Sequence, residues 1–363
     1  MRWSIELFRF KGISVKLHLT FFLVLVWAAY SWGVAQNRGM AGALFGIVAI
    51  TLLFLSVVVH EFAHSLQALK FGARVKEIIL LPIGGVSRME SMPEKPGQEF
   101  VVAIVGPLTS FVIAGLLFAV SVVLGVQFSL GTEALRTILE STSLEGLLAY
   151  LIVANLILGI FNLLPAFPMD GGRVLRALMA MRLGYARATK IAVVLGEVMA
   201  IVFGFWGFMS GNFFLVFIGV FIFFGASQEG RVGVLKAALK GIRVDDAYSA
   251  NPEILAPGDP VARAVGLALH SFQSDFPVVA EGRIVGLLTK SEIYLAVHKH
   301  HPLIAVSAVM RKDFISVGPS DSLFDVQQKM AVNRQSAALV VENNELKGLL
   351  TVDDISEAYR FLS

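Results

Sequence analysis

Residues 43–64 read ALFGIVAITLLFLSVVVHEFAH, an apolar run that ends in three ionisable side chains. A helix that crosses a bilayer needs about 20 mostly apolar residues, so this run predicts a transmembrane helix over residues 43–66. The ionisable residues at its end are His60, Glu61 and His64. Such side chains are costly inside a spanning helix and usually serve a function. The stretch therefore predicts a membrane protein and also marks where its chemistry lies.

The composition of the whole chain supports a membrane protein. Of its 363 residues, 56% are hydrophobic and 16% are charged, whereas soluble domains carry roughly 25% charged residues. The net charge of +3 comes without a basic stripe interleaved with aromatic residues, which argues against a nucleic-acid partner. The absence of cysteine excludes disulfides and thiolate metal ligands, so any metal must be held by histidine and carboxylate.

The long apolar runs lie in the first two thirds of the chain. Basic residues gather before the first run, between the second and third, between the fourth and fifth, and after the last. Because positively charged loops stay in the cytoplasm, we predict a multi-pass plasma-membrane protein with its N-terminus and C-terminal part both cytoplasmic. The runs predict about six transmembrane helices, at residues 17–36, 43–66, 100–126, 145–166, 187–209 and 212–227.

His60 and His64 have the spacing of a zinc site. Four residues apart, they lie on one face of a helix, where two imidazoles can bind one metal ion and Glu61 can accept a proton from its water. A catalytic zinc needs a third protein ligand. The stretch FNLLPAFPMDGGRVL (161–175) offers Asp170, at a Pro- and Gly-rich break where the fourth span should unwind. The alternatives are polar residues that only bridge helices and, for Asp170, a polar turn at the membrane boundary.

Two motifs together, HEFAH (60–64) and NLLPAFPMDGG (162–172), resemble those of the site-2 protease family of intramembrane metalloproteases. The resemblance covers about residues 1–230. It implies a catalytic core built from the second to fourth spans. It also implies one Zn2+ per chain, held by His60, His64 and Asp170.

The same resemblance implies the reaction. Glu61 is expected to act as general base and then as acid during hydrolysis of a peptide bond. The expected substrate is a membrane protein whose spanning helix unwinds locally, as in regulated intramembrane proteolysis. Asn162 either contacts the substrate backbone and its oxyanion or makes an interhelical hydrogen bond of about 1 kcal/mol. The sequence leaves both roles open.

Two more segments match the family. LPIGGVSRME, within residues 80–90, predicts a membrane-associated hairpin or re-entrant segment. The pair Gly106-Pro107 lies in the third span, where the family pattern often has an asparagine a few residues later. Here Thr109 and Ser110 follow, so the sequence assigns no role at that point.

The C-terminal part contains an internal repeat whose two copies end in GLLTKSEI and GLLTVDDI. Each copy predicts a short strand, a helix, two strands joined by a turn and a second helix. The repeat resembles a tandem pair of CBS domains, at residues 245–300 and 305–363, after a membrane peptidase domain at 1–235. The predicted fold is thus a polytopic α-helical membrane protein with a C-terminal α/β tandem CBS module.

The CBS resemblance implies an adenine nucleotide such as ATP in the cleft between the copies. Thr351 and Asp354 fit the positions that hold phosphate and ribose. The first copy has Thr289 but carries Glu292 in place of aspartate, so one site is expected to be intact. The alternative is that Thr351 and Asp354 only cap a helix. Paired CBS modules also mediate dimerisation, which implies a homodimer as a further partner.

Three function classes fit these features. The first is a zinc metalloendopeptidase whose partners are the bilayer, a membrane-protein substrate and an adenine nucleotide. The others are a catalytically idle adaptor and a nucleotide-gated transporter with a CBS sensor. An idle adaptor would normally have lost a ligand or the base, and a transporter would often show a pattern repeated between its halves. The complete set of His60, Glu61, His64 and Asp170 favours the protease.

Overall fold

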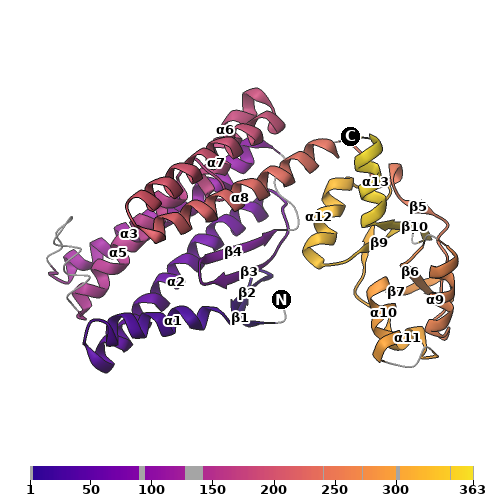
Figure 1. The fold of residues 1–363 in the computed structure, drawn as a ribbon, viewed down its shortest axis with the longest axis horizontal. Helices are drawn as coiled ribbons and strands as arrows, with labels where there is room; N and C mark the ends of the chain where they lie inside the picture. Colours follow the sequence, from indigo (N-terminus) through magenta and orange to yellow (C-terminus); the bar gives the residue numbers. More distant parts are fainter. Residues whose placement is uncertain are drawn as a thin grey trace. The chain divides into compact units, whose positions relative to one another are not determined.

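The computed structural model describes residues 3–89, 95–126, 142–239, 241–271, 273–299, 303–343 and 345–362. The chain divides into two compact units, Met1–Gly233 and Val234–Ser363. The first is mainly helical and the second is α/β (Figure 1).

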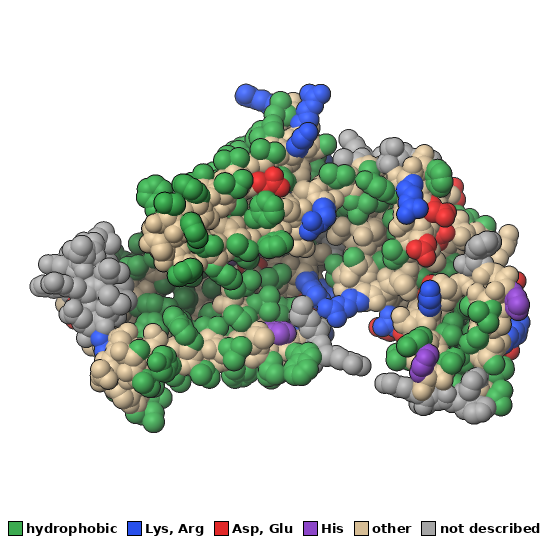
Figure 2. Space-filling view, in the orientation of Figure 1, with side chains coloured by type: hydrophobic (Ala, Val, Ile, Leu, Met, Phe, Trp, Pro, Cys, Tyr) green, Lys and Arg blue, Asp and Glu red, His purple; other side chains and the backbone are tan. Residues whose placement is uncertain are grey.

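Helices make up most of the first unit. Five of them, α2, α3, α5, α7 and α8, are long and apolar enough to cross a membrane by length and composition, which agrees with a polytopic helical membrane protein. Hydrophobic side chains cover much of this unit's visible surface (Figure 2), as expected of helices that face lipid. The helices are α1 (Phe21–Ala29), a π-helix (Tyr30–Val34), α2 (Gly39–Lys70), α3 (Pro96–Val123), α5 (Leu144–Asn162), α6 (Asp170–Leu183), α7 (Tyr185–Met209) and α8 (Phe213–Ala238).

The first predicted span, 17–36, differs from the other five. Its first residues belong to a strand, and its helical part has 9 residues of α1 and 5 of the π-helix. At 1.5 Å per residue this piece is about 21 Å long, shorter than a hydrocarbon core of about 30 Å. Hydropathy alone predicted a span here, because it cannot distinguish the end of the preceding strand from the start of a helix.

A four-stranded sheet packs against α2. Its order is β1-β2-β3-β4, with β2 and β3 parallel and the other pairs antiparallel. Alternate residues such as Ile13, Val15, Ile78 and Leu80 are buried in one core with α2, as the two-residue period of a strand requires. The hairpin predicted within residues 80–90 is β3–β4, with β4 at the edge of the sheet. The strands are β1 (Ser4–Phe10), β2 (Ile13–His18), β3 (Val75–Leu81) and β4 (Gly84–Met89).

The break predicted after the fourth span is present. Helix α5 ends at Asn162 and α6 begins at Asp170. Pro165 and Pro168 lie in the intervening segment, where their missing N–H groups and fixed φ oppose a continuous helix. Helix α3 contacts α2, α5 and α6. The break therefore brings the start of α6 beside the helices that carry the other candidate residues.

The second unit repeats one pattern twice. The first copy contains the two-stranded sheet β6-β7. The second copy contains β8, β9 and β10, and the first copy's β5 joins their sheet by pairing with β10, which gives the order β5-β10-β9-β8. Each copy has its own buried core, one around Phe276 and Leu288 and one around Val340 and Leu350. The elements are β5 (Ser249–Ala250), α9 (Val261–His270), β6 (Phe276–Ala280), β7 (Arg283–Leu288), α10 (Lys290–Lys299), α11 (Val306–Val309), β8 (Ile315–Val317), α12 (Leu323–Asn333), β9 (Ala337–Glu342), β10 (Glu345–Thr351) and α13 (Val352–Leu362).

Candidate metal centre

Three ligand atoms converge between α2 and the start of α6. His60 and His64 are buried and lie one turn apart on α2. Their Nε2 atoms are 3.1 Å apart. Oδ2 of Asp170 lies 3.3 Å from Nε2 of His60 and 3.1 Å from Nε2 of His64. All three ligand atoms are within 4.8 Å of one another.

The other ring nitrogen of each histidine is held by α3. Nδ1 of His64 donates to the carbonyl oxygen of Val102 at 2.6 Å, and Nδ1 of His60 lies 2.9 Å from Oγ of Ser110. Such outer partners orient metal-binding histidines and leave Nε2 for the metal. The result is two imidazole nitrogens and a carboxylate oxygen turned toward one point. These donors repel one another unless a cation lies between them, so the residues fit a zinc ion.

Helix α3 passes this point at Gly106. A Cβ atom there would lie 2.0 Å from Nε2 of His64 and 2.7 Å from Nε2 of His60. Only glycine leaves room for the two rings and an ion. Ser110 follows Gly106 by one helical turn, on the same face of α3.

Strand β4 holds Glu61 next to the histidines. Oγ of Ser87 donates to Oε2 of Glu61 at 2.6 Å. A Cβ atom on Gly85 would lie 2.6 Å from Cγ of Glu61, so the edge strand is in close contact with this side chain. Glu61 is half-buried. Its carboxylate therefore lies beside the ligand atoms with one oxygen fixed by a neutral donor.

A buried ionic cluster fixes α6. Arg176 is 3% exposed, and its Nε donates to Oε1 of Glu99 on α3 at 2.8 Å. Its Nη1 donates to Oε2 of Glu229 on α8 at 3.1 Å. The guanidinium carbon also lies 4.9 Å from the ring centre of Phe167 and 5.0 Å from that of Tyr185. Helix α6 is thus tied to α3 and α8 two turns after Asp170.

The structure brings together His60, Glu61, His64 and Asp170, as the sequence motifs predict. Asn162 lies at the end of α5, is half-buried and has no side-chain hydrogen bond among the described residues. The interhelical hydrogen bond considered for it is made by Asn155, whose Nδ2 donates to Oγ of Ser56 at 3.3 Å.

Sequence reasoning missed Ser110, Ser87 and the ionic cluster. The spacing of Ser110, one helical turn after Gly106, was an available signal, since it puts a hydroxyl on the face of α3 that passes the histidines. The cluster had a weaker signal. Glu99 and Glu229 lie at the outer ends of apolar segments, where a charge is easily taken as the end of a span.

Known proteins are similar to this sequence over its full length. The model of peptidase family M50 matches residues 48–203, and the CBS domain model matches residues 244–299 and 306–360. The zinc metalloprotease MJ0392 of Methanocaldococcus jannaschii is 35% identical over 362 residues, which cover 100% of this chain and 98% of that protein. The chain belongs to peptidase family M50, the site-2 proteases.

Two further relatives of this M50 protease match parts of it. Stage IV sporulation protein FB of Bacillus subtilis is 29% identical over 159 residues, which are 44% of this chain and 49% of that protein. A solved structure of a site-2 protease from Methanocaldococcus jannaschii is 40% identical, with a TM-score of 0.46. The match covers 63% of this chain and 95% of the chain in that structure. The family matches and the full-length relative, together with the apolar helices, show a membrane metalloprotease that carries a tandem CBS module.

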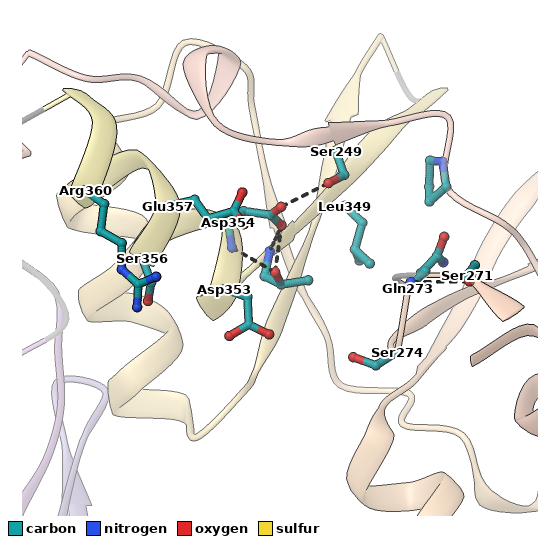
Figure 3. Close-up of a pocket in the computed structure, with 12 residues that line it drawn as sticks. Ser249, Ser271, Gln273, Ser274, Leu349, Asp353, Asp354, Ser356, Glu357 and Arg360 are labelled. Atoms are coloured by element: carbon teal, nitrogen blue, oxygen red, sulfur yellow. Dashed lines mark hydrogen bonds between the residues drawn. The ribbon is translucent and has the colours of Figure 1, made fainter. Parts of the chain in front are cut away.

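The CBS module of this M50 protease has a cavity of about 770 Å3 lined by both copies (Figure 3). Ser271 and Ser274 line it from the first copy, and Thr351, Asp353 and Asp354 from the second. Figure 3 shows Ser274 and Asp353 on opposite sides of the opening.

Within that cavity, Thr351 and Asp354 bind each other. Oγ1 of Thr351 donates to Oδ2 of Asp354 at 2.7 Å, and the backbone N–H of Asp354 donates to Oγ1 of Thr351 at 3.1 Å. They cap α13 and also line the cavity. Thr289 is instead buried against Glu292, which pairs with Arg311 at 3.3 Å, and neither residue lines this cavity.

Proposed function

We propose that His60, His64 and Asp170 hold one zinc ion and that Glu61 is the general base, in a peptidase domain of residues 1–235. The proposed reaction is hydrolysis of peptide bonds in or near the transmembrane segments of membrane proteins. The observation that carries it is the convergence of two Nε2 atoms and one Oδ2 atom within 4.8 Å, beside Glu61, in a bundle of apolar helices.

Each residue of the site has a separate role in the proposed reaction. When bound, zinc makes its water a better acid and polarises the scissile carbonyl. Glu61 takes the proton of the attacking water and passes it to the leaving amine. The hydrogen bond from Ser87 to Oε2 holds the carboxylate in one orientation. The bonds from α3 to Nδ1 of both histidines keep their Nε2 atoms turned inward.

Strand β4 suggests how a substrate is presented. It is an edge strand, and Gly85 and Ser87 on it contact Glu61. An extended peptide can pair with such an edge through backbone hydrogen bonds. A spanning helix cannot, because its backbone groups are already bonded to each other. The proposed substrate is therefore a membrane protein whose helix unwinds beside β4, and contact of Asn162 with its backbone stays a prediction.

We also propose a multi-pass plasma-membrane location with the N-terminus and CBS module in the cytoplasm. The bias of basic residues among the loops supports this orientation. Large exposed apolar side chains on α7 and α8, such as Phe205, Trp206 and Phe214, support contact with lipid.

A second proposal concerns regulation by the CBS pair, placed at residues 245–300 and 305–363. The cavity lined by Thr351 and Asp354 favours binding of an adenine nucleotide such as ATP, with Asp354 accepting from ribose hydroxyls. The buried position of Thr289 and the pairing of Glu292 with Arg311 favour a single such site. Dimerisation through the CBS domains stays a prediction.

The test of the proposed function compares the wild type with Glu61→Gln. Both proteins are purified, their zinc content is measured, and each is reconstituted with single-span membrane proteins. We expect one zinc per chain in both and cleavage by the wild type alone. His60→Ala should lose the metal. Zinc in both proteins with no cleavage dependent on Glu61 would favour the idle adaptor.

A further inference from the structure

A group of four charged residues packs beside the metal centre without belonging to it. We call it the α6 cluster: Arg173 and Arg176 on α6, Glu99 on α3 and Glu229 on α8. Arg176 and Glu99 are buried. The two arginines and two glutamates balance in charge, so the loss of any one of these charges leaves the cluster unbalanced.

Glu229 is the member that contacts both arginines. Its Oε2 accepts from Nη1 of Arg176 at 3.1 Å, and its Oε1 lies 3.5 Å from Nη2 of Arg173. It comes from α8, beyond residue 203, where the match to the M50 model ends.

Arg173 is the member closest to the metal centre along the chain. It lies three residues after Asp170 on α6, which puts the two side chains on neighbouring positions of one helix face. Its Nε is buried and has no hydrogen-bond partner among the described residues. Arg173 therefore has an unused donor, and only Glu229 pairs with its guanidinium in the cluster.

Removing the charge of Glu229 would change this balance. Arg176 would keep Glu99, but Arg173, whose side chain is 28% exposed, would lose its partner in the cluster, and a partly buried charge without a partner is costly. The carboxylate one turn away is Asp170. A guanidinium binds a carboxylate strongly and with two parallel hydrogen bonds. Such a pair would compete with a metal ion for Asp170.

We propose that Glu229 is a positioning residue of the metal centre. By pairing with Arg173 and Arg176 it keeps Arg173 away from Asp170 and leaves that carboxylate to the metal. The inference rests on the proposed role of Asp170 as a zinc ligand.

The test measures metal affinity in the full-length protein, independently of proteolysis. Zinc affinity is obtained by competition with a chelator, and the visible spectrum of the Co2+-loaded protein reports the ligand geometry. Glu229→Gln should weaken zinc binding by about tenfold or more, the size of effect that outer partners of metal ligands have. It should also change the Co2+ spectrum. Glu197→Gln, which alters a carboxylate on α7 outside the cluster, is the matched control and should change neither.

Rescue separates positioning from general stability. Adding Arg173→Met to Glu229→Gln removes the competing cation and should restore zinc affinity to within about threefold of the wild type, a difference below 1 kcal/mol. Glu229→Asp keeps the charge and should bind zinc like the wild type, so it separates the effect of the lost charge from that of an altered side chain at this position.

Two results would overturn the inference: unchanged zinc affinity in Glu229→Gln, or a loss that Arg173→Met does not restore. Unchanged zinc affinity in the Asp170→Ala variant would instead refute the proposed metal site itself.

Discussion

At Gly106, helix α3 passes the two histidines without a side chain of its own. Replacing it with alanine would put a methyl group 2.0 Å from Nε2 of His64. Backbone atoms cannot move that far without separating α3 from α2. We therefore expect Gly106→Ala to lose zinc and activity almost completely, as measured by metal content and substrate cleavage.

The control for this change is Gly115→Ala on the same helix. A Cβ atom at Gly115 meets nothing within 4 Å. Alanine is also favoured over glycine in a helix by roughly 1 kcal/mol. Zinc content should stay at the wild-type level. Normal zinc binding by Gly106→Ala would show that the histidines do not face α3 as described.

Ser110 contacts Nδ1 of His60, the ring nitrogen that does not face the other ligand atoms. Ser110→Ala removes the partner of Nδ1 and frees the ring to rotate or change tautomer. We expect zinc affinity to fall by about 10- to 100-fold, as for other outer partners of metal ligands. Chelator competition measures it. Thr109→Ala is the control, because the Thr109 hydroxyl donates to the carbonyl oxygen of Val105 within its own helix.

Asp275 makes the stability of the CBS unit depend on pH. Burial raises the pKa of this carboxyl, against the lowering effect of hydrogen bonds from Lys290 N–H and the Ser336 hydroxyl. A raised folded-state pKa means that its contribution to stability is full below the unfolded pKa of about 3.9 and is lost as pH rises through the folded value.

Asp275→Asn keeps an acceptor for both donors and removes the buried charge. We expect it to raise the unfolding temperature of the CBS unit at pH 7 by a few degrees, with the gain shrinking toward pH 4. Thermal unfolding at several pH values measures it. A gain that is equal at pH 4 and pH 7 would contradict a buried ionised carboxylate.

Among the elements, strand β4 contacts the proposed general base without supplying a metal ligand. Its Ser87 fixes one oxygen of Glu61. Ser87→Ala should lower kcat by about tenfold, since a misaligned base loses part of the 10²- to 10⁴-fold that general-base catalysis supplies. Zinc content should not change. Ser121→Ala on α3, whose hydroxyl bonds the carbonyl of Phe118, is the control. An equal fall in both variants would point to general destabilisation.

The break between α5 and α6 shows what element-level reasoning can reach. Two prolines and a Gly-Gly pair predicted that the helix would unwind before Asp170, and it does. The first apolar run shows where such reasoning stops. Its hydropathy resembles that of the other spans, but its N-terminal part pairs with β1 and β3 as strand β2. Strand pairing depends on residues far along the chain, so a local window does not show it.

At the scale of the whole molecule, α8 belongs to both units. Glu229 on it pairs with α6, and six residues later Leu235 packs with Leu239 in the core of the second CBS copy. Because the helix is continuous, the CBS unit is covalently connected through α8 to Glu229 of the α6 cluster.

The two halves of the CBS pair should differ in nucleotide binding. Asp354→Ala should weaken ATP binding by at least tenfold, because a carboxylate bonded to ribose hydroxyls contributes about 1.5–3 kcal/mol. Glu292→Ala should have little effect, since Glu292 pairs with Arg311 and does not line the cavity. Calorimetric titration of the full chain measures both. Equal losses in the two variants would contradict a single site.

The sequence by itself determined the class of the molecule and its main chemical groups. Apolar runs, the four-residue spacing of His60 and His64 and the repeat after residue 240 are local patterns, and local patterns follow from helix geometry and hydropathy. Only the tertiary structure decided which groups surround them. Ser110, Ser87 and Glu229 meet His60, Glu61 and the arginines of α6 across 26 to 56 residues of sequence. Such contacts depend on how α3, β4 and α8 pack, and no spacing along one segment contains that information.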